Sequence, residues 1–90
     1  MPQAIVDPDE LRRFAAALKR FNGDLQNAMQ VLHGQLGGLS QTWRDQENLK
    51  FTAEFEQTMI AISRFIEASN DQIPFLMRKA ERIEEYMQQR

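Results

Sequence analysis

Residues 11–39 read LRRFAAALKRFNGDLQNAMQVLHGQLGGL, and this stretch decides the fold. Its leucines recur at intervals of seven residues, namely Leu11, Leu18, Leu25, Leu32 and Leu39. Phe14, Phe21 and Ala28 fill a second position of the same repeat, and Met29 and Leu36 widen the stripe. An apolar pattern held over about four heptads is typical of a helix that packs along a coiled-coil seam.

The flanks of this segment predict where the helix begins and ends. Asp7 suits the N-cap, Pro8 the first helical position, and Glu10 completes a capping box. The pair Gly37-Gly38 is typical of a helix end followed by a turn. We therefore expect the first helix at about 8–37.

A second apolar stripe follows at intervals of three and four residues, which predicts a helix at about 42–88. Its members are Phe55, Met59, Ile62, Ile66, Ser69, Ile73, Leu76, Ala80, Ile83 and Met87. Thr42 with Asp45 is a plausible capping pair at its start, and Ser40 is a competing N-cap. Pro74 predicts a kink, because proline removes a backbone hydrogen bond. A true break, with Asn70 or Asp71 capping a third helix, is the alternative.

Two long helices joined by a short turn predict an all-α, antiparallel two-helix hairpin, a single domain over 1–90. The expected core and dimer seam comprises Leu11, Phe14, Leu18, Phe21, Leu25, Leu32, Phe55, Met59, Ile62, Ile66, Ile73, Leu76 and Ile83. One seam does not use all the apolar surface, since Phe51, Phe65, Phe75 and Tyr86 also lie outside the second stripe. We expect the excess to be covered by a second hairpin, in a four-helix-bundle homodimer or a heterodimer with a similar hairpin.

Composition excludes several classes of function. The 90 residues carry 11 basic and 13 acidic side chains, so nucleic acid is not an expected partner. With no cysteine and one histidine, we expect no metal, no cofactor and no disulfide. No apolar run exceeds five residues, so we expect no membrane insertion, and residues 1–10 have no features of a signal peptide. No acid lies on the main stripes and no nucleophile has a recognisable base, so we expect no catalytic residues and no enzyme activity.

Trp43 stands just after the expected turn, and with it the whole chain resembles the WXG family of early-secreted-antigen-like helical hairpins. The family's Trp-x-Gly is here Trp43-Arg44-Asp45, and its C-terminal Tyr-x-x-x-Asp/Glu is here Tyr86 followed by Arg90. The tryptophan and the tyrosine match, whereas the glycine and the acid do not.

The resemblance implies an antiparallel dimer in which the tryptophan end of one hairpin lies near the termini of the other. It implies a type VII secretion substrate or adaptor, secreted without a cleaved signal peptide. Such proteins act as virulence-type effectors or as export partners, and a secretion ATPase or a larger effector is an implied partner. Trp43, Asp45 and Tyr86 would be the recognition motif.

Each of these interpretations has a plainer alternative. Trp43 can simply plug the open end of a bundle, and Tyr86 can be a half-buried interface residue. The whole chain can equally be an intracellular coiled-coil adaptor that stays in the cytoplasm.

Overall fold

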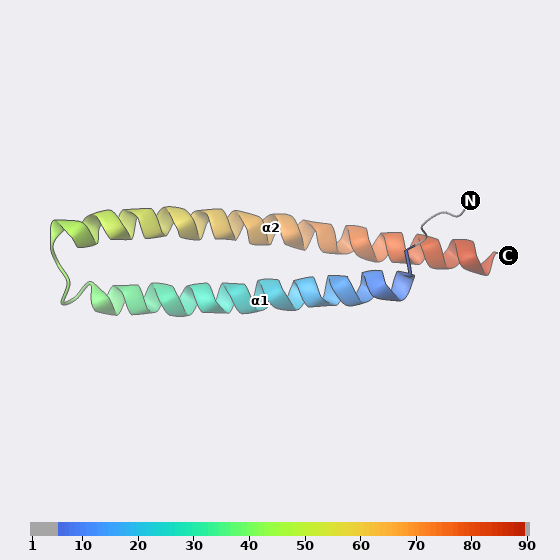
Figure 1. The fold of residues 1–90 in the computed structure, drawn as a ribbon, viewed down its shortest axis with the longest axis horizontal. Coiled ribbons are helices and arrows are strands. Elements are labelled where there is room, and N and C mark those ends of the chain that lie inside the picture. The colour runs from blue at the N-terminus through green and yellow to red at the C-terminus, as the bar shows by residue number, and fades with distance from the viewer. Residues whose placement is uncertain (1–5, 90) are drawn as a thin grey trace.

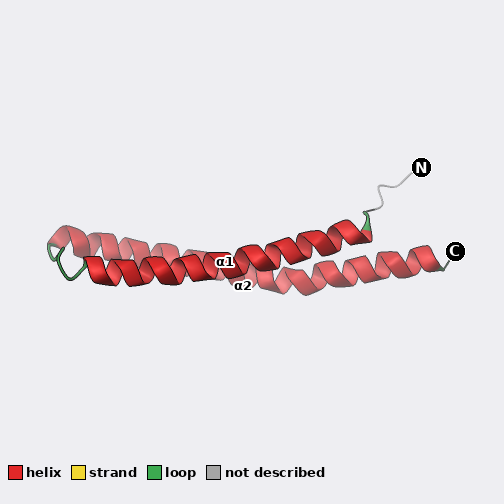
Figure 2. Cartoon of the chain, turned by 90° about the horizontal axis from the view of Figure 1, so that it is seen from below, coloured by secondary structure: helices red, strands yellow, loops and turns green. Residues whose placement is uncertain are grey.

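The computed structural model describes residues 6–89 and shows two long helices side by side. Helix α1 spans Pro8–Leu39 and helix α2 spans Gln46–Gln88. The two run antiparallel and cross at a shallow angle, as the perpendicular view shows (Figures 1 and 2). The molecule measures 69 × 20 × 17 Å. The expected all-α hairpin is therefore confirmed.

Helix α1 begins where the sequence predicts. Asp7 has extended backbone angles, and its carboxylate accepts a hydrogen bond from the Asp9 N–H at 2.9 Å. Pro8 follows as the first helical residue. The capping bond thus goes to the second helical residue, not to Glu10 as a capping box requires.

The expected end of α1 at Gly37-Gly38 is wrong. Both glycines are helical, and the helix ends at Leu39 with Ser40 as its C-cap in a right-handed conformation. No residue of the described chain has a positive φ. The last carbonyls are instead satisfied by the turn itself, because the Ser40 N–H donates to the Leu36 carbonyl and the Trp43 N–H to the Leu39 carbonyl, each at 2.9 Å.

The start of α2 is also later than expected. The helix begins at Gln46, and its N-cap is Asp45. Thr42 does not cap it, because its hydroxyl donates to the Leu39 carbonyl at the end of α1. Pro74 lies within α2 without breaking it, so a third helix capped by Asn70 or Asp71 is excluded. Both views show a gentle curve and no sharp corner along α2.

The seam between the helices differs from the expected one on α1. Leu11, Leu18 and Leu25 are half-buried as predicted. Their seam partners are Ala15, Asn22, Met29 and Leu36, which are buried or half-buried. Phe14, Phe21 and Leu32 were expected in the seam but are 59%, 52% and 48% exposed.

Small side chains explain this difference. Ala15 faces a seam that also contains Ala80 and Ser69 on α2, and all three are almost fully buried. Small residues let two helices approach closely, and the bulky rings are then displaced to the flank. On α2 the expected seam residues Phe55, Met59, Ile62, Ile66, Ile73, Leu76 and Ile83 are all buried or half-buried.

Candidate recognition motif and interaction surface

Trp43 lies in the turn that joins the helices, partly exposed at one end of the molecule. Its ring lies 5.9 Å from that of Phe51, centroid to centroid, and Phe51 lies 5.9 Å from Phe55 in a stacked pair. The three rings form a small aromatic cluster over the start of α2. The cluster gives Trp43 a fixed support while leaving part of it open to solvent, as suits a contact residue.

The turn is held by side-chain hydrogen bonds. The Asn48 amide donates to the Ser40 hydroxyl at 3.2 Å, and Asn48 itself is almost fully buried. The Arg44 guanidinium donates to the Gln41 carbonyl at 2.8 Å. The Asn48–Ser40 bond joins the end of α1 to the first turn of α2, and the Arg44–Gln41 bond spans the turn in which Trp43 lies.

Asp45 occupies the N-cap of α2. Its carboxylate accepts from the Asn48 N–H at 3.0 Å, and its backbone is extended, with φ -99° and ψ -175°. This geometry does not need glycine, and aspartate is among the residues that cap best. The residue two places after Trp43 thus has a structural role in beginning the second helix.

Tyr86 lies near the far end of α2, 66% exposed, at the opposite end of the hairpin from Trp43 (Figure 1). The structure does not bring these two predicted recognition residues together within one chain. Arg90, the position of the acid in the family's export pattern, lies outside the described residues.

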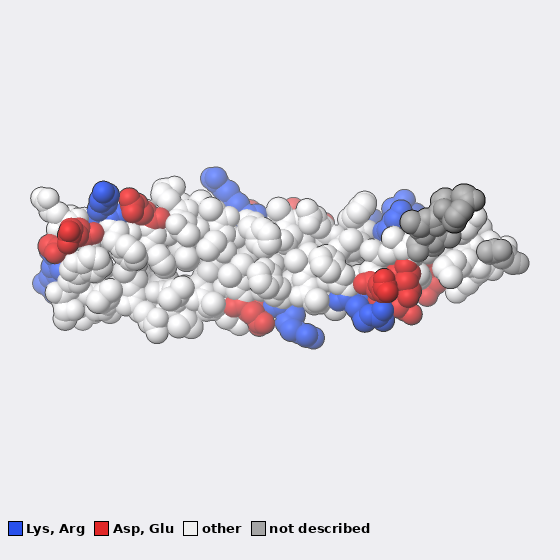
Figure 3. Space-filling model, viewed as in Figure 1, with Lys and Arg blue, Asp and Glu red and all other residues white. Residues whose placement is uncertain are grey.

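One side of the hairpin is an uncharged band that runs along both helices, with charged groups gathered at its edges (Figure 3). We call this side the apolar face. Its exposed large residues are Phe14, Phe21, Leu32, Leu39, Phe51, Phe65 and Phe75. Phe21 of α1 and Phe65 of α2 meet edge to face at 6.3 Å, which joins the two halves of the band. An apolar surface of this extent on a small chain indicates an interface.

The apolar face also contains a hollow of about 210 Å³ near the turn. Its lining residues are Leu32, Gln35, Leu36, Leu39, Phe51 and Phe55. The hollow therefore adjoins the aromatic cluster that supports Trp43. Its walls are almost entirely apolar, so it suits an apolar side chain.

The other side of the hairpin, the polar face, carries the contacts between charged groups of the two helices. Arg12 donates two hydrogen bonds to the Glu84 carboxylate, at 2.7 and 3.3 Å. These bonds lower the pKa of the Glu84 carboxyl and, together with Coulombic attraction, raise the pKa of Arg12. His33 Nε2 lies 3.1 Å from a Glu56 oxygen. Sequence analysis missed these pairs, because charge alone does not show which residues of two helices are neighbours.

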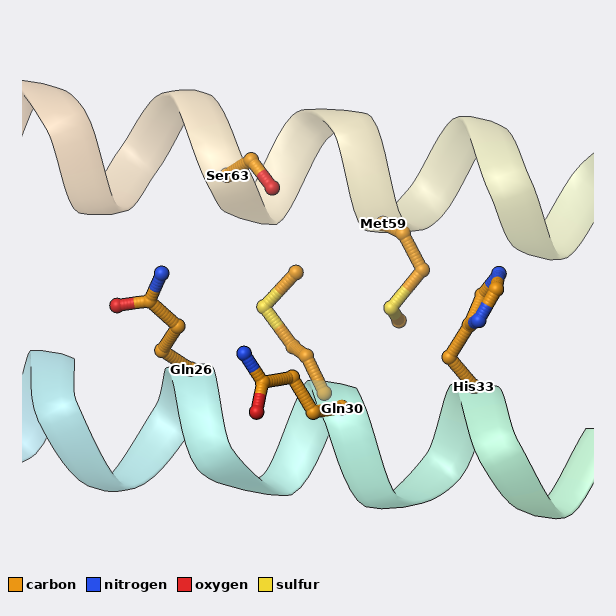
Figure 4. Close-up of a pocket in the computed structure, with 6 residues that line it drawn as sticks. Gln26, Gln30, His33, Met59 and Ser63 are labelled. Atoms are coloured by element: carbon orange, nitrogen blue, oxygen red, sulfur yellow. The ribbon is translucent and has the colours of Figure 1, made fainter.

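A second hollow, of about 320 Å³, opens on the polar face (Figure 4). It is lined by Gln26, Met29, Gln30, His33, Met59 and Ser63. These side chains extend into the space between the helices (Figure 4). Their amide, hydroxyl and imidazole groups can form hydrogen bonds, and the two methionines can make apolar contacts. Within residues 6–89, no three histidine, cysteine or acidic side chains come together as metal ligands.

Two asparagines join the helices, Asn22 buried in the seam and Asn70 exposed on α2. Asn22 is 2% exposed, and its amide donates to the Asn70 side-chain oxygen at 3.0 Å. The signal was present in the sequence, because Asn22 falls seven residues after Ala15 and seven before Met29. A polar contact made by a buried seam residue helps to fix the register of two helices.

No helix in the described part of the chain has an apolar stretch long enough to cross a bilayer.

Comparisons with known proteins agree with the hairpin. A family model, WXG100, described as proteins of 100 residues with WXG, matches residues 3–88. The chain is similar to the secreted protein EsxB of Bacillus anthracis strain Sterne, with 28% identity over 92% of this chain and 89% of that one, and a TM-score of 0.78. A point mutant of the same EsxB gives 28% identity over 94% and 98% of the two chains, with a TM-score of 0.77. A comparison with curated proteins gives no match.

Proposed function

The chain belongs to the WXG100 family of helical hairpins associated with type VII secretion, and on that premise we propose that it is a substrate or adaptor of such a system. It acts as a non-enzymatic interaction protein, exported without a cleaved signal peptide. The observation that carries the proposal is the family match over residues 3–88. The likeness to EsxB, which is described as secreted, supports export in particular.

The working form of the protein is a dimer of hairpins in a four-helix bundle. The apolar face supports this part of the proposal, because it exposes five phenylalanines along one side of a 90-residue chain: Phe14, Phe21, Phe51, Phe65 and Phe75. Fully burying an exposed ring contributes about 1.5–3 kcal/mol. These rings are about half exposed, so covering each one contributes roughly half of that and favours a second hairpin on this face. The seam residues of the hairpin and the rings of the apolar face would then share one core.

Trp43, Asp45 and Tyr86 are the proposed recognition motif. Trp43 is the anchor, supported by Phe51 and only partly covered. Asp45 acts through it, because capping α2 fixes the turn in which Trp43 lies. Tyr86 is the second contact, exposed at the other end of the hairpin. The partners we propose are the secretion ATPase, or a larger effector whose export the dimer assists.

The alternative is an intracellular coiled-coil adaptor that uses the same apolar face and is not exported. In such an adaptor Trp43 and Tyr86 would only pack against neighbouring side chains and would not be needed for recognition by a secretion system. Release from the cell therefore separates the two proposals.

The test compares culture supernatant with cell pellet in a type VII host, with and without the secretion ATPase, beside a cytosolic lysis marker. We expect release that depends on the ATPase. Trp43→Ala and Tyr86→Ala should each reduce release with unchanged helix content by circular dichroism, whereas Trp43→Phe and Tyr86→Phe serve as conservative controls. Retention of the unmodified chain in both strains would overturn export and leave the intracellular adaptor.

A further inference from the structure

The hollow on the polar face brings two methionines and the single histidine of the chain together. Met29 and His33 are four residues apart on α1, so their side chains lie one turn apart on the same side of that helix. Met59 enters from α2, and it points into the same space as His33 (Figure 4). The hollow is therefore lined by two thioether sulfurs and one imidazole, contributed by two different helices.

A small ion can reach these three groups from solvent. The hollow keeps about 320 Å³ of open space between the helices. Met29 and Met59 are half-buried, whereas the His33 side chain is 62% exposed. Methionine has three rotatable bonds, so each thioether can turn toward an ion without movement of the backbone. The hollow thus combines an open entry with adaptable sulfur ligands.

Glu56 sets the orientation and the tautomer of the imidazole. His33 Nε2 lies 3.1 Å from a Glu56 carboxylate oxygen. An ionised carboxylate only accepts hydrogen bonds, so Nε2 of the neutral imidazole carries the proton and the free lone pair lies on Nδ1. Histidines that bind metals usually donate their other ring N–H to a carboxylate, which also makes the ligating nitrogen more basic. The His33–Glu56 contact has this arrangement.

The types of ligand select the ion. Thioethers are soft ligands that select Cu(I), and imidazole also binds copper. Zinc is bound by thiolate, imidazole and carboxylate groups, so two thioethers do not suit it. The two sulfurs and the imidazole are neutral, and Glu56 adds one negative charge beside His33. One negative charge neutralises a monovalent cation and leaves a divalent one uncompensated.

From these observations we propose that the hollow on the polar face is a binding site for one Cu(I) ion. Met29 Sδ, Met59 Sδ and His33 Nδ1 are its ligands, and Glu56 is a positioning residue that orients the imidazole. The expectation of no metal considered cysteine and histidine, whereas this site depends on thioethers. The inference does not rest on the proposed function. Because the hollow and the apolar face lie on opposite sides of the hairpin, a dimer through the apolar face would hold two ions, one in each chain.

Metal titration of the full chain tests the site. The probes are Ag(I) in chloride-free buffer, as a redox-stable substitute for Cu(I), and Cu(I) itself under anaerobic conditions against a coloured competing chelator. We expect one ion per chain by native mass spectrometry and calorimetry. Zn(II) at the same concentrations should give no measurable heat.

Leucine variants test the two sulfur ligands, because leucine replaces methionine with little change in packing volume. Met29→Leu and Met59→Leu should each weaken Ag(I) and Cu(I) binding about tenfold or more, since loss of an outer-shell partner alone typically weakens a metal site about 10–100-fold. Met77→Leu is the matched control, because Met77 is an exposed methionine of α2 that does not line the hollow. Circular dichroism checks that each variant is folded.

Glu56→Gln tests the positioning of the imidazole. It should weaken binding about tenfold, and Glu54→Gln, a change at an exposed acid of the same helix, should leave binding unchanged. Nitrogen NMR of the His33 ring gives a readout that a purely structural role would not move. The Nε2–H tautomer should dominate in the unmodified chain and give way to a mixture of tautomers in Glu56→Gln.

Methyl NMR shows which thioethers bind. On addition of one equivalent of Ag(I), the ε-methyl signals of Met29 and Met59 should shift, whereas those of Met77 and Met87 should not. Equal shifts of all four signals, or equal weakening in Met77→Leu, would mean that exposed thioethers bind the ion without a site, and would overturn the proposal. Absence of binding, or binding that is unchanged in Met29→Leu and Met59→Leu, would overturn it too. Export and dimerisation are measured separately and do not depend on these results.

Discussion

Asp45 stands where the family pattern has glycine, and its backbone angles explain why either residue serves. The position is an N-cap with φ -99°, which aspartate adopts without strain. We predict that Asp45→Gly lowers the free energy of unfolding by only a few tenths of a kcal/mol and Asp45→Ala by about 1 kcal/mol. Urea unfolding of both variants checks this, with Asp7→Ala as a second capping site. An Asp45→Gly variant as unstable as Asp45→Ala would show that the carboxylate has a role beyond capping.

Glu84 gives the hairpin a pH dependence whose sign follows from its partner. Arg12 lowers the pKa of the folded carboxyl, so ionised Glu84 stabilises the fold above its unfolded pKa of about 4.3. This contribution should be lost as the pH falls through the lower, folded pKa. We predict that Glu84→Gln flattens the fall in melting temperature between about pH 5 and pH 3. Glu85→Gln on the same turn is the control, and equal flattening in that variant would argue against a role for the Arg12 pair.

At the scale of elements, Pro74 is a residue that does not suit the interior of the helix that contains it. Its ring removes a backbone donor from the interior of α2, yet the helix runs through it. Because Pro74 is exposed, alanine there should lose no packing. We predict that Pro74→Ala stabilises the protein by about 1–3 kcal/mol with unchanged helix content. Thermal unfolding followed by circular dichroism measures this. An unchanged melting temperature would mean that the curve of α2 at Pro74 already satisfies the freed carbonyl.

The apolar pattern of the sequence predicts the two helices but not all of the residues that pack between them. The seven-residue leucine repeat correctly predicted the first helix, and the second stripe, at intervals of three and four, correctly predicted the second helix. The short turn between them correctly predicted the hairpin. The leucine repeat did not predict which neighbour of each leucine enters the seam. Phe14 and Ala15 flank Leu11 equally well in the pattern, and only the close approach of the two helices selects the alanine.

Helix ends were predicted less well for a related reason. Gly37 and Gly38 resemble a helix stop, yet the helix runs through them. The carbonyls of Leu36, Gly38 and Leu39 accept hydrogen bonds from the N–H groups of Ser40, Gln41 and Trp43. Such bonds depend on where the next helix begins. Asp45 was predicted in the first turn of α2, as part of a capping pair with Thr42, but it is itself the N-cap. The sequence does not show this, because Thr42 and Ser40 offer equally good caps.

At the scale of the whole molecule, the hairpin has a thin core. Its buried apolar residues are Ala15, Leu36, Ile66 and Ala80, and no large side chain is fully buried within the described residues. Two helices that share one narrow seam bury too little to be very stable alone. The proposed dimer would therefore supply much of the stability, so folding and association should be coupled. We predict that the melting temperature rises by several degrees for each tenfold increase in protein concentration. A melting temperature independent of concentration, with a monomer by light scattering, would contradict this.

A single change on the apolar face should then separate association from the hairpin itself. Phe65 meets Phe21 near the middle of the face and is half exposed in the hairpin, so Phe65→Glu removes no fully buried contact within one chain. In a dimer it would bury two carboxylates without partners, which is strongly unfavourable. We predict a monomer whose melting temperature is lower and no longer depends on concentration. Leu25→Asp, in the seam, should instead unfold the helices themselves. If Phe65→Glu remained dimeric by sedimentation, the partner would have to lie on another face, and the exposed rings would need a different explanation.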